Sequence, residues 1–115
     1  MERLKKRADF LAVAAAGTRI HGAGFVLQLR DRADGKAARV GFTVSKKVGT
    51  AVERNRVRRR LREIVRRHGP DAIRSGCDYV VIGRRNALDL PFDRLSADLS
   101  RALARSPAPL RNRVS

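Results

Sequence analysis

The sequence contains almost no cysteine and few aromatic residues. Among its 115 residues there are one cysteine, one tyrosine, four phenylalanines and no tryptophan. A single cysteine excludes an intramolecular disulfide and a zinc site built from several cysteines, and it fits a reducing compartment. Because Cys77 adjoins the apolar run 79–82, we expect it to be a small buried residue.

Long hydrophobic runs are also missing. No stretch approaches the roughly 18 consecutive apolar residues of a membrane-spanning helix, so the sequence predicts no membrane segment. The N-terminus imitates a signal peptide, because basic residues precede the apolar run 10–16. That run is short, is mostly alanine and follows Asp9, which argues against secretion. We therefore expect a cytoplasmic protein.

Acidic residues are scarce compared with basic ones. The chain has 27 lysines and arginines against 11 acids, which gives a net charge of +16. Such a charge destabilises a small domain by self-repulsion and favours a polyanionic partner. Of the basic residues 22 are arginines, whose guanidinium groups suit bidentate phosphate contacts. Nucleic acid is the expected partner, ahead of an anionic membrane, and no small-molecule substrate is indicated.

The few acidic residues do not form a cluster. Metal-dependent phosphodiester hydrolysis needs several carboxylates close together, whereas the aspartates here are spread along the chain. His21 and His68 have no partner at metal-ligand spacing. The sequence therefore predicts neither a catalytic side chain nor a metal ion or cofactor held by the protein alone.

The length supports one domain, and 43% hydrophobic residues are enough for a folded core. We expect a domain over residues 1–105 and a solvated tail over 106–115. Periodicity predicts helices over 3–16, 50–68 and 91–104 and strands over 24–30, 38–45 and 78–83. Together they indicate an α+β sandwich.

In the first of these helices, the residues at helical spacing form one apolar stripe that we expect to face the core. The stripe comprises Leu4, Ala8, Leu11 and Ala15. Phe10, Val13 and Ala14 fall on other sides of the helix, so this interpretation leaves Phe10 away from the main core.

The helix expected over 50–68 carries eight arginines and two acids. Its apolar residues Val57, Leu61, Ile64 and Val65 form a narrow stripe, which we expect to be buried against another part of the protein. On the opposite side, a polar row about 16 Å long at 1.5 Å per residue consists of Asn55, Arg59, Arg62 and Arg66. An ordinary solvated face mixes charges of both signs, so this row favours nucleic-acid binding.

The residues just before this helix extend the basic surface. Lys46 and Lys47 end the second strand, and Gly49 allows a tight turn. Lysines beside the free backbone N–H groups of a helix N-terminus make a natural phosphate site. Asn55 can donate and accept hydrogen bonds, so it could reach a base edge, a sugar hydroxyl or a metal-bound water.

The run VGFTVSKKVGTAVERNRVRRRLRE over residues 40–63 resembles the signature of the bacterial ribonuclease P protein family. The resemblance covers roughly residues 3–104 and includes RLKK at 3–6, Phe10, FVL at 25–27 and DYVVIGR at 78–84. It implies a sheet of about four strands packed with helices, with the arginine-rich helix in a left-handed βαβ crossover. General handedness rules alone predict a right-handed one.

The resemblance also implies the function. Proteins of this family are subunits of ribonuclease P, in which an RNA subunit, using Mg²⁺ that it mainly holds itself, removes the 5′ leader of precursor tRNA. The protein would bind the RNA subunit and the single-stranded leader, and it would carry no catalytic residue of its own.

Two sets of site residues follow from the same resemblance. The surface that meets the RNA subunit would comprise Lys46, Lys47, Arg54, Asn55, Arg56, Arg58, Arg59, Arg62 and Arg66. A leader-binding cleft would comprise Phe10, Val13, Ala14, Val26, Gln28 and Arg30. The family often has aromatic residues where this chain has Ala14 and Gln28, so leader contacts would depend more on Arg30, Val26 and backbone phosphates.

Three other interpretations are compatible with parts of the sequence. A non-catalytic ribosomal or RNA-chaperone protein would have the same composition. A DNA-binding regulator could place the 50–68 helix in a major groove, although no helix-turn-helix partner is visible. An RNA-recognition fold is suggested by the stretch 39–44, but its single aromatic residue is a weak match.

Overall fold

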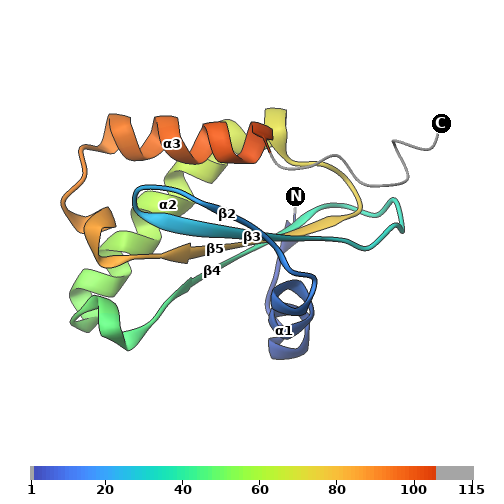
Figure 1. The fold of residues 1–115 in the computed structure, drawn as a ribbon, viewed down its shortest axis with the longest axis horizontal. Coiled ribbons are helices and arrows are strands. Elements are labelled where there is room, and N and C mark those ends of the chain that lie inside the picture. Colours follow the sequence, from blue (N-terminus) through green and yellow to red (C-terminus); the bar gives the residue numbers. More distant parts are fainter. Residues whose placement is uncertain (1, 106–115) are drawn as a thin grey trace.

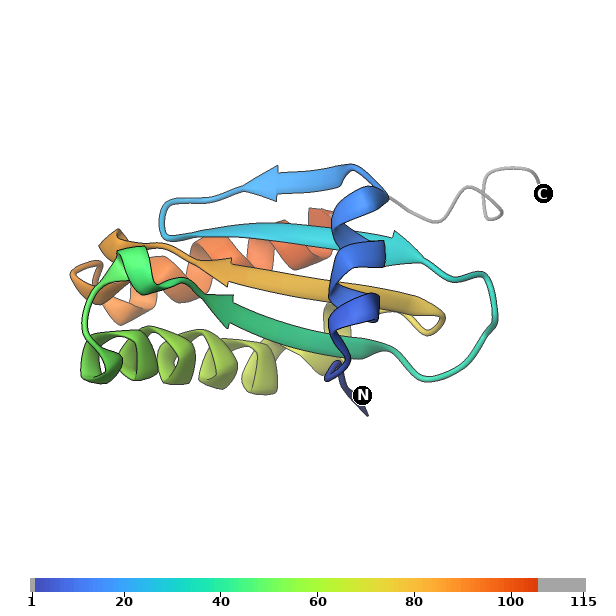
Figure 2. The same ribbon diagram turned by 90° about the horizontal axis from the view of Figure 1, so that it is seen from below.

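The computed structural model describes residues 2–105, so the expected tail at 106–115 lies outside the described residues. A five-stranded sheet has α2 and α3 on one face and α1 on the other (Figures 1 and 2). The strands are β1 (Glu2–Arg3), β2 (Thr18–His21), β3 (Phe25–Asp31), β4 (Arg39–Val44) and β5 (Cys77–Gly83). The helices are α1 (Arg7–Ala15), α2 (Ala51–Ala72) and α3 (Phe92–Arg105), with 3-10 turns η1 (Lys46–Val48) and η2 (Arg85–Leu88).

The α+β class is confirmed, but the sheet has five strands, in the order β1-β4-β5-β3-β2. The sequence interpretation missed the two edge strands. β1 is two residues long and pairs with β4 in parallel, and β2 is four residues long and pairs with β3 antiparallel. Segments this short carry too few alternations to stand out in a periodicity test. β5 is the central strand, as expected.

The connection from β4 to β5 has the unusual handedness that the family resemblance implied. These strands are parallel neighbours, with Arg39 opposite Asp78. In Figure 2 the chain leaves β4, passes behind the sheet through α2 and returns in β5, which makes the crossover left-handed. α2 lies on the face of the sheet opposite α1 and runs beside β4 (Figures 1 and 2).

The main core lies between the sheet and the pair α2–α3. The apolar stripe expected on α2 is confirmed, because Val57, Leu61 and Ile64 are 0% exposed and Val65 is 2% exposed. They pack in one cluster with sheet residues such as Phe25. Full burial of such a side chain contributes about 1.5–3 kcal/mol, so this stripe fixes which face of α2 remains in solvent.

The end of α2 differs from the expectation. The helix continues through Gly69 and Pro70 to Ala72, instead of ending near residue 68. Gly69 is buried, and its carbonyl accepts a hydrogen bond of 2.7 Å from the N–H of Ile73. Ile73 packs against the main core, so tertiary packing holds the last turn in place despite the proline.

The apolar stripe expected on the first helix was wrong. Leu11 is 56% exposed, whereas Val13 is fully buried and Phe10 half-buried. These two side chains pack with Leu4 and Val80 in a second, smaller cluster on the opposite face of the sheet from α2. In a nine-residue, alanine-rich helix two stripes were possible, and the sheet selects the one with the larger side chains.

Gly41 of β4 allows α1 to lie this close to the sheet. A Cβ at this position would stand 2.5 Å from Cζ of Phe10 and 3.1 Å from Cβ of Leu4. We expect Gly41→Ala to lower the free energy of unfolding by about 1–3 kcal/mol, as overpacking typically does, in urea denaturation. The double variant Gly41→Ala, Phe10→Leu should recover part of the lost free energy of unfolding. If the single and double variants lose equally much, the strain does not come from the contact with the Phe10 ring.

Candidate nucleic-acid interface

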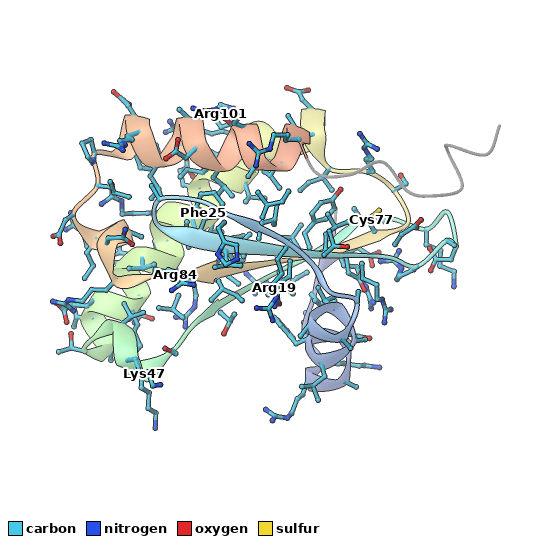
Figure 3. All side chains as sticks on the ribbon, viewed as in Figure 1. Arg19, Phe25, Lys47, Cys77, Arg84 and Arg101 are labelled. Carbon is cyan, nitrogen blue, oxygen red and sulfur yellow. The ribbon has the colours of Figure 1, made fainter. Side chains whose placement is uncertain are left out.

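The outer face of α2 carries the polar row that the sequence predicted. Asn55, Arg59, Arg62 and Arg66 are all exposed along it. Arg56 is exposed beside them, while Arg54 and Arg58 are half-buried. Lys46 and Lys47 are exposed in η1, and Lys47 projects away from the sheet (Figure 3). The set therefore extends from η1 along the outer face of α2.

The N-terminus of α2 is closed by the protein itself. The Thr50 hydroxyl accepts a hydrogen bond from the Glu53 N–H at 3.2 Å, and the Glu53 carboxylate accepts one from the Thr50 N–H at 2.9 Å. The latter bond lowers the pKa of Glu53. The expectation of free N–H groups was therefore wrong for these two, and the Thr50-x-x-Glu53 spacing could have indicated a capping box.

Gly49 precedes this cap in a conformation that a side chain would not tolerate. Its φ is 153°, and a Cβ would overlap Oε1 of Glu53 and lie 2.8 Å from Nη1 of Arg85. Arg85 in turn donates to the carbonyl of Val48 at 2.5 Å and lies 3.5 Å from the Glu53 carboxylate. The turn thus holds η1, with its two lysines, against the start of α2.

The charges along α2 are unevenly compensated. Glu63 accepts hydrogen bonds from Arg66 at 2.6 and 2.9 Å and from Arg67 at 2.7 Å. These bonds lower the pKa of Glu63 to about 2, with the Arg66 contribution the largest. Within residues 2–105, Arg56 and Arg59 have neither a hydrogen bond nor an ion pair. Uncompensated charge therefore concentrates in the first half of the helix.

Two other members of the predicted set make contacts inside the protein. Arg58 donates to Oδ1 of Asn55 at 2.8 Å, which leaves the amide NH₂ of Asn55 to donate to a ligand. The guanidinium of Arg62 lies 5.7 Å from the ring centroid of Phe42. Such contacts hold both guanidinium groups in place without cancelling their charge.

The second predicted set lies on the α1 side of the sheet. Phe10, Val13 and Ala14 of α1 meet the face of β3 that carries Val26 and Gln28. Val13, Val26 and Gln28 are 0, 3 and 5% exposed, so they lie within the contact between helix and sheet. Phe10, Ala14 and Arg30 keep accessible surface, and the leader contact predicted for the set remains a prediction.

Arg30 belongs to a buried ion cluster that the sequence interpretation missed. The carboxylate of Asp78 is 0% exposed and accepts two hydrogen bonds of 2.8 Å from Arg39, a further one from Arg32, and lies 3.4 Å from Arg30. Burial acts to raise the pKa of Asp78, but the hydrogen bonds from Arg39 and Arg32 lower it. Arg39 also bonds Asp9 of α1 at 3.2 Å, so the cluster anchors α1 to the sheet.

Two exposed arginines on the α1 side were also missed. Arg19 lies opposite Gln28 in the β2–β3 ladder, and Arg84 continues the alternation of Val80 and Ile82 beyond β5. Both lie on the same side of the sheet as α1 and Lys47 (Figure 3). Extending the period-2 pattern of the strand expected at 78–83 by one residue would have found Arg84.

Two kinds of feature are missing from the part of the chain that the structure describes. None of its helices is both long and apolar enough to cross a membrane. In the same residues there is no group of three or more histidine, cysteine or acidic side chains that could hold a metal ion.

A small α+β domain whose long helix exposes several arginines, with Arg56 and Arg59 uncompensated, is typical of a nucleic-acid-binding protein. Comparison with known proteins agrees with this class and narrows it. The model of the family Ribonuclease P matches residues 1–106. The ribonuclease P protein component of Paramagnetospirillum magneticum is 50% identical over 109 residues, which are 91% of this chain and 82% of that protein. That of Gluconacetobacter diazotrophicus is 50% identical over 104 residues, 90% of each chain.

Solved structures show the same relationship. The RNase P protein from Thermotoga maritima superimposes with a TM-score of 0.80 at 32% identity, covering 94% of this chain and all (100%) of that one. The RNase P protein of Staphylococcus aureus gives 0.78 at 31% identity, covering 92% and 97%. The chain belongs to the ribonuclease P protein family. The expected role as a protein subunit of ribonuclease P is confirmed, and nothing supports the ribosomal or chaperone alternative.

Because the chain belongs to the ribonuclease P protein family, binding to ribonuclease P RNA can test the unequal charge compensation along α2. Arg59→Ala should weaken binding to ribonuclease P RNA by about tenfold, as expected for the removal of a charge-assisted hydrogen bond. Arg66→Ala should weaken it by less than about threefold, because Glu63 already neutralises Arg66. Both variants remove one positive charge, so filter binding compares them directly. Equal effects would show that the Arg66–Glu63 pair opens when RNA binds.

Proposed function

We propose that this chain binds ribonuclease P RNA through the outer face of α2 and η1, and that the 5′ leader of precursor tRNA lies along the α1 side of the sheet. The observation that carries the first half is the pair of uncompensated arginines, Arg56 and Arg59, beside exposed Asn55 in a chain of this family. An unpaired arginine gains most from a phosphate because it gives up no partner inside the protein.

The same proposal assigns the chemistry to the RNA subunit. When bound by that RNA, Mg²⁺ would supply the activated water and the stabilisation of the leaving oxygen. The described residues of this chain do not fit such an ion, since their acidic groups are scattered or already paired with arginine. Its own contribution is to neutralise phosphates, so that two polyanions can approach each other.

For the leader, the α1 side offers a partly exposed aromatic ring and several cations. Phe10 could stack a base, a contact worth about 1–3 kcal/mol, and Arg19 and Arg84 face the same side (Figure 3). Arg30 is committed to Asp78, so we assign it a smaller share of phosphate binding than Arg19 and Arg84. Since only precursor tRNA has a leader, these contacts favour substrate over product.

Reconstitution with the RNA subunit tests this function. At low Mg²⁺, where the RNA alone is slow, adding the protein should restore cleavage of precursor tRNA at the 5′ end of the mature tRNA. The gain should shrink for a substrate with a leader of one nucleotide. No gain with any substrate would overturn the assignment. We further propose that the protein acts in the cytoplasm, where tRNA is processed.

A further inference from the structure

A groove lined in part by Arg56 and Arg59 of the first predicted set lies between α2 and the segment from η2 to the start of α3. Its volume is about 640 Å³, within the range of pockets that hold small ligands. Arginines of α2 line one wall, and the stretch 88–92 lines the other. The groove includes Arg59 of the polar row, and the helices α2 and α3 that contribute to its lining lie on the face of the sheet opposite α1 (Figure 1).

The walls of this groove are fixed in place by Arg60. Its guanidinium donates to the carbonyl of Leu88 at 2.9 Å and also to that of Leu90. It lies 5.9 Å from the ring centroid of Phe92, and the guanidinium of Arg67 lies 5.5 Å from the same centroid. Because Arg60 bridges the helix to the loop, the groove is a preformed feature of the fold.

The charges around the groove are arranged with opposite signs at its two walls. Arg56 and Arg59 stand uncompensated on the helix side. Glu63 lines the same side, but Arg66 and Arg67 already neutralise it. On the loop side the exposed carboxylate of Asp89 follows the apolar Leu88. A phosphate is therefore attracted to the helix wall and repelled from the loop.

The loop wall also offers an apolar surface. Leu90, Pro91 and Phe92 contribute to it, and Pro91 is exposed. A planar group that enters the groove beside Arg60 can lie against these residues and against the guanidinium plane, as unpaired bases do in RNA-binding proteins. The arginine wall therefore suits the phosphate of a nucleotide, and the apolar wall suits its base.

We propose that this groove binds one unpaired nucleotide of ribonuclease P RNA, with its phosphate at Arg56 and Arg59 and its base against Leu90 and Pro91. This inference rests on the proposed binding of that RNA by α2. The leader of precursor tRNA is not the occupant, because the α1 side of the sheet is on the far side of the molecule (Figures 1 and 2). Asp89 can accept a hydrogen bond from an exocyclic amino group, which adenine, cytosine and guanine have and uracil does not.

Site-directed crosslinking tests the groove. The only natural cysteine, Cys77, is buried, so a cysteine introduced as Pro91→Cys can be labelled selectively with an azidophenacyl group. In the holoenzyme with precursor tRNA, we expect the label to crosslink to an unpaired adenosine, cytidine or guanosine of the RNA subunit. Ala97→Cys, on α3 outside the groove, should give no crosslink at that nucleotide.

A charge variant provides a second measurement. Pro91→Glu should weaken RNA binding by about tenfold more than Ala97→Glu. Both variants add one negative charge, Pro91→Glu just before α3 and Ala97→Glu within it. Crosslinks to the leader, to base-paired RNA only, or equally from both cysteine variants would overturn the inference. So would equal affinities of the two glutamate variants. Wild-type protein that fails to bind the RNA in the same assay would instead overturn the proposed function itself.

Discussion

Asp78→Asn is expected to lower the free energy of unfolding by about 3 kcal/mol, at the lower end of what breaking a buried ion pair costs. The carboxylate is 0% exposed, while the side chains of Arg30 and Arg39 are 30 and 25% exposed and can recover some hydration. A loss of this size is a large fraction of a typical total of about 5–15 kcal/mol. Urea denaturation at neutral pH measures it.

Asp71→Asn is the matched control, because Asp71 is exposed near the end of α2 and the substitution makes the same change in charge. It should alter stability by no more than about 0.5 kcal/mol. If Asp78→Asn costs equally little, the three arginines are solvated well enough without their carboxylate. The cluster would then have no share in holding α1 on the sheet.

The same substitution changes how stability depends on pH. The folded state lowers the pKa of Asp78, so its contribution is present above the unfolded pKa of about 4 and is lost as the pH falls further. The stability difference between wild type and Asp78→Asn should therefore shrink between about pH 5 and pH 3. A difference that stays constant over this range would mean that Asp78 is not the titrating group.

The second large effect is expected on RNA binding. Asn55→Ala combined with Arg59→Ala should weaken binding to ribonuclease P RNA by about a hundredfold or more, because each of the two lost hydrogen bonds to phosphate is worth about 1.5–3 kcal/mol. The slope of log affinity against log salt should also become shallower by about 0.7–0.9 for each phosphate that the variant no longer neutralises. Binding curves at several salt concentrations give both quantities.

Arg101→Ala is the control for this variant, since it also removes one positive charge but lies on α3 (Figure 3). It should retain nearly wild-type affinity. The double variant should keep the wild-type far-UV circular dichroism, because neither side chain is buried. Loss of that signal would mean that the row is structural, and unchanged affinity would place the RNA on another surface.

The sequence predicted the long arginine-rich helix well and the short elements poorly. The buried face of α2 follows from Val57 and Leu61 recurring at helical spacing, and a long helix repeats such a pattern several times. In α1 the pattern has few repeats, and it wrongly placed Leu11 on the core stripe and Phe10 outside it. β1 and β2 depend on pairing with β4 and β3, which local sequence does not encode.

Part of the candidate site could likewise be predicted from the sequence, and part could not. Which residues lie on the outer face of α2 followed from periodicity, and they are exposed as predicted. Which of them keep a free charge was missed, although Glu63 stands at the i,i+3 and i,i+4 spacings from Arg66 and Arg67 that allow ion pairs on one helix. In the Asp78 cluster, Arg30 and Arg32 come from the end of β3 and the residues after it, and Arg39 comes from the start of β4. They meet Asp78 only because β3 and β4 both pair with β5, which spacing in the sequence does not show.

The uneven compensation along α2 gives the protein an electrostatic direction. The free cations and the positive end of the helix dipole coincide at the N-terminal half, whereas Glu63 reduces the field near the C-terminal half. A polyanion that diffuses toward the molecule is therefore drawn first to the end that carries η1, before any short-range contact forms. The field would therefore both accelerate the encounter between protein and RNA and orient it. Fewer collisions would then need a subsequent rearrangement before the two molecules reach the correct relative orientation.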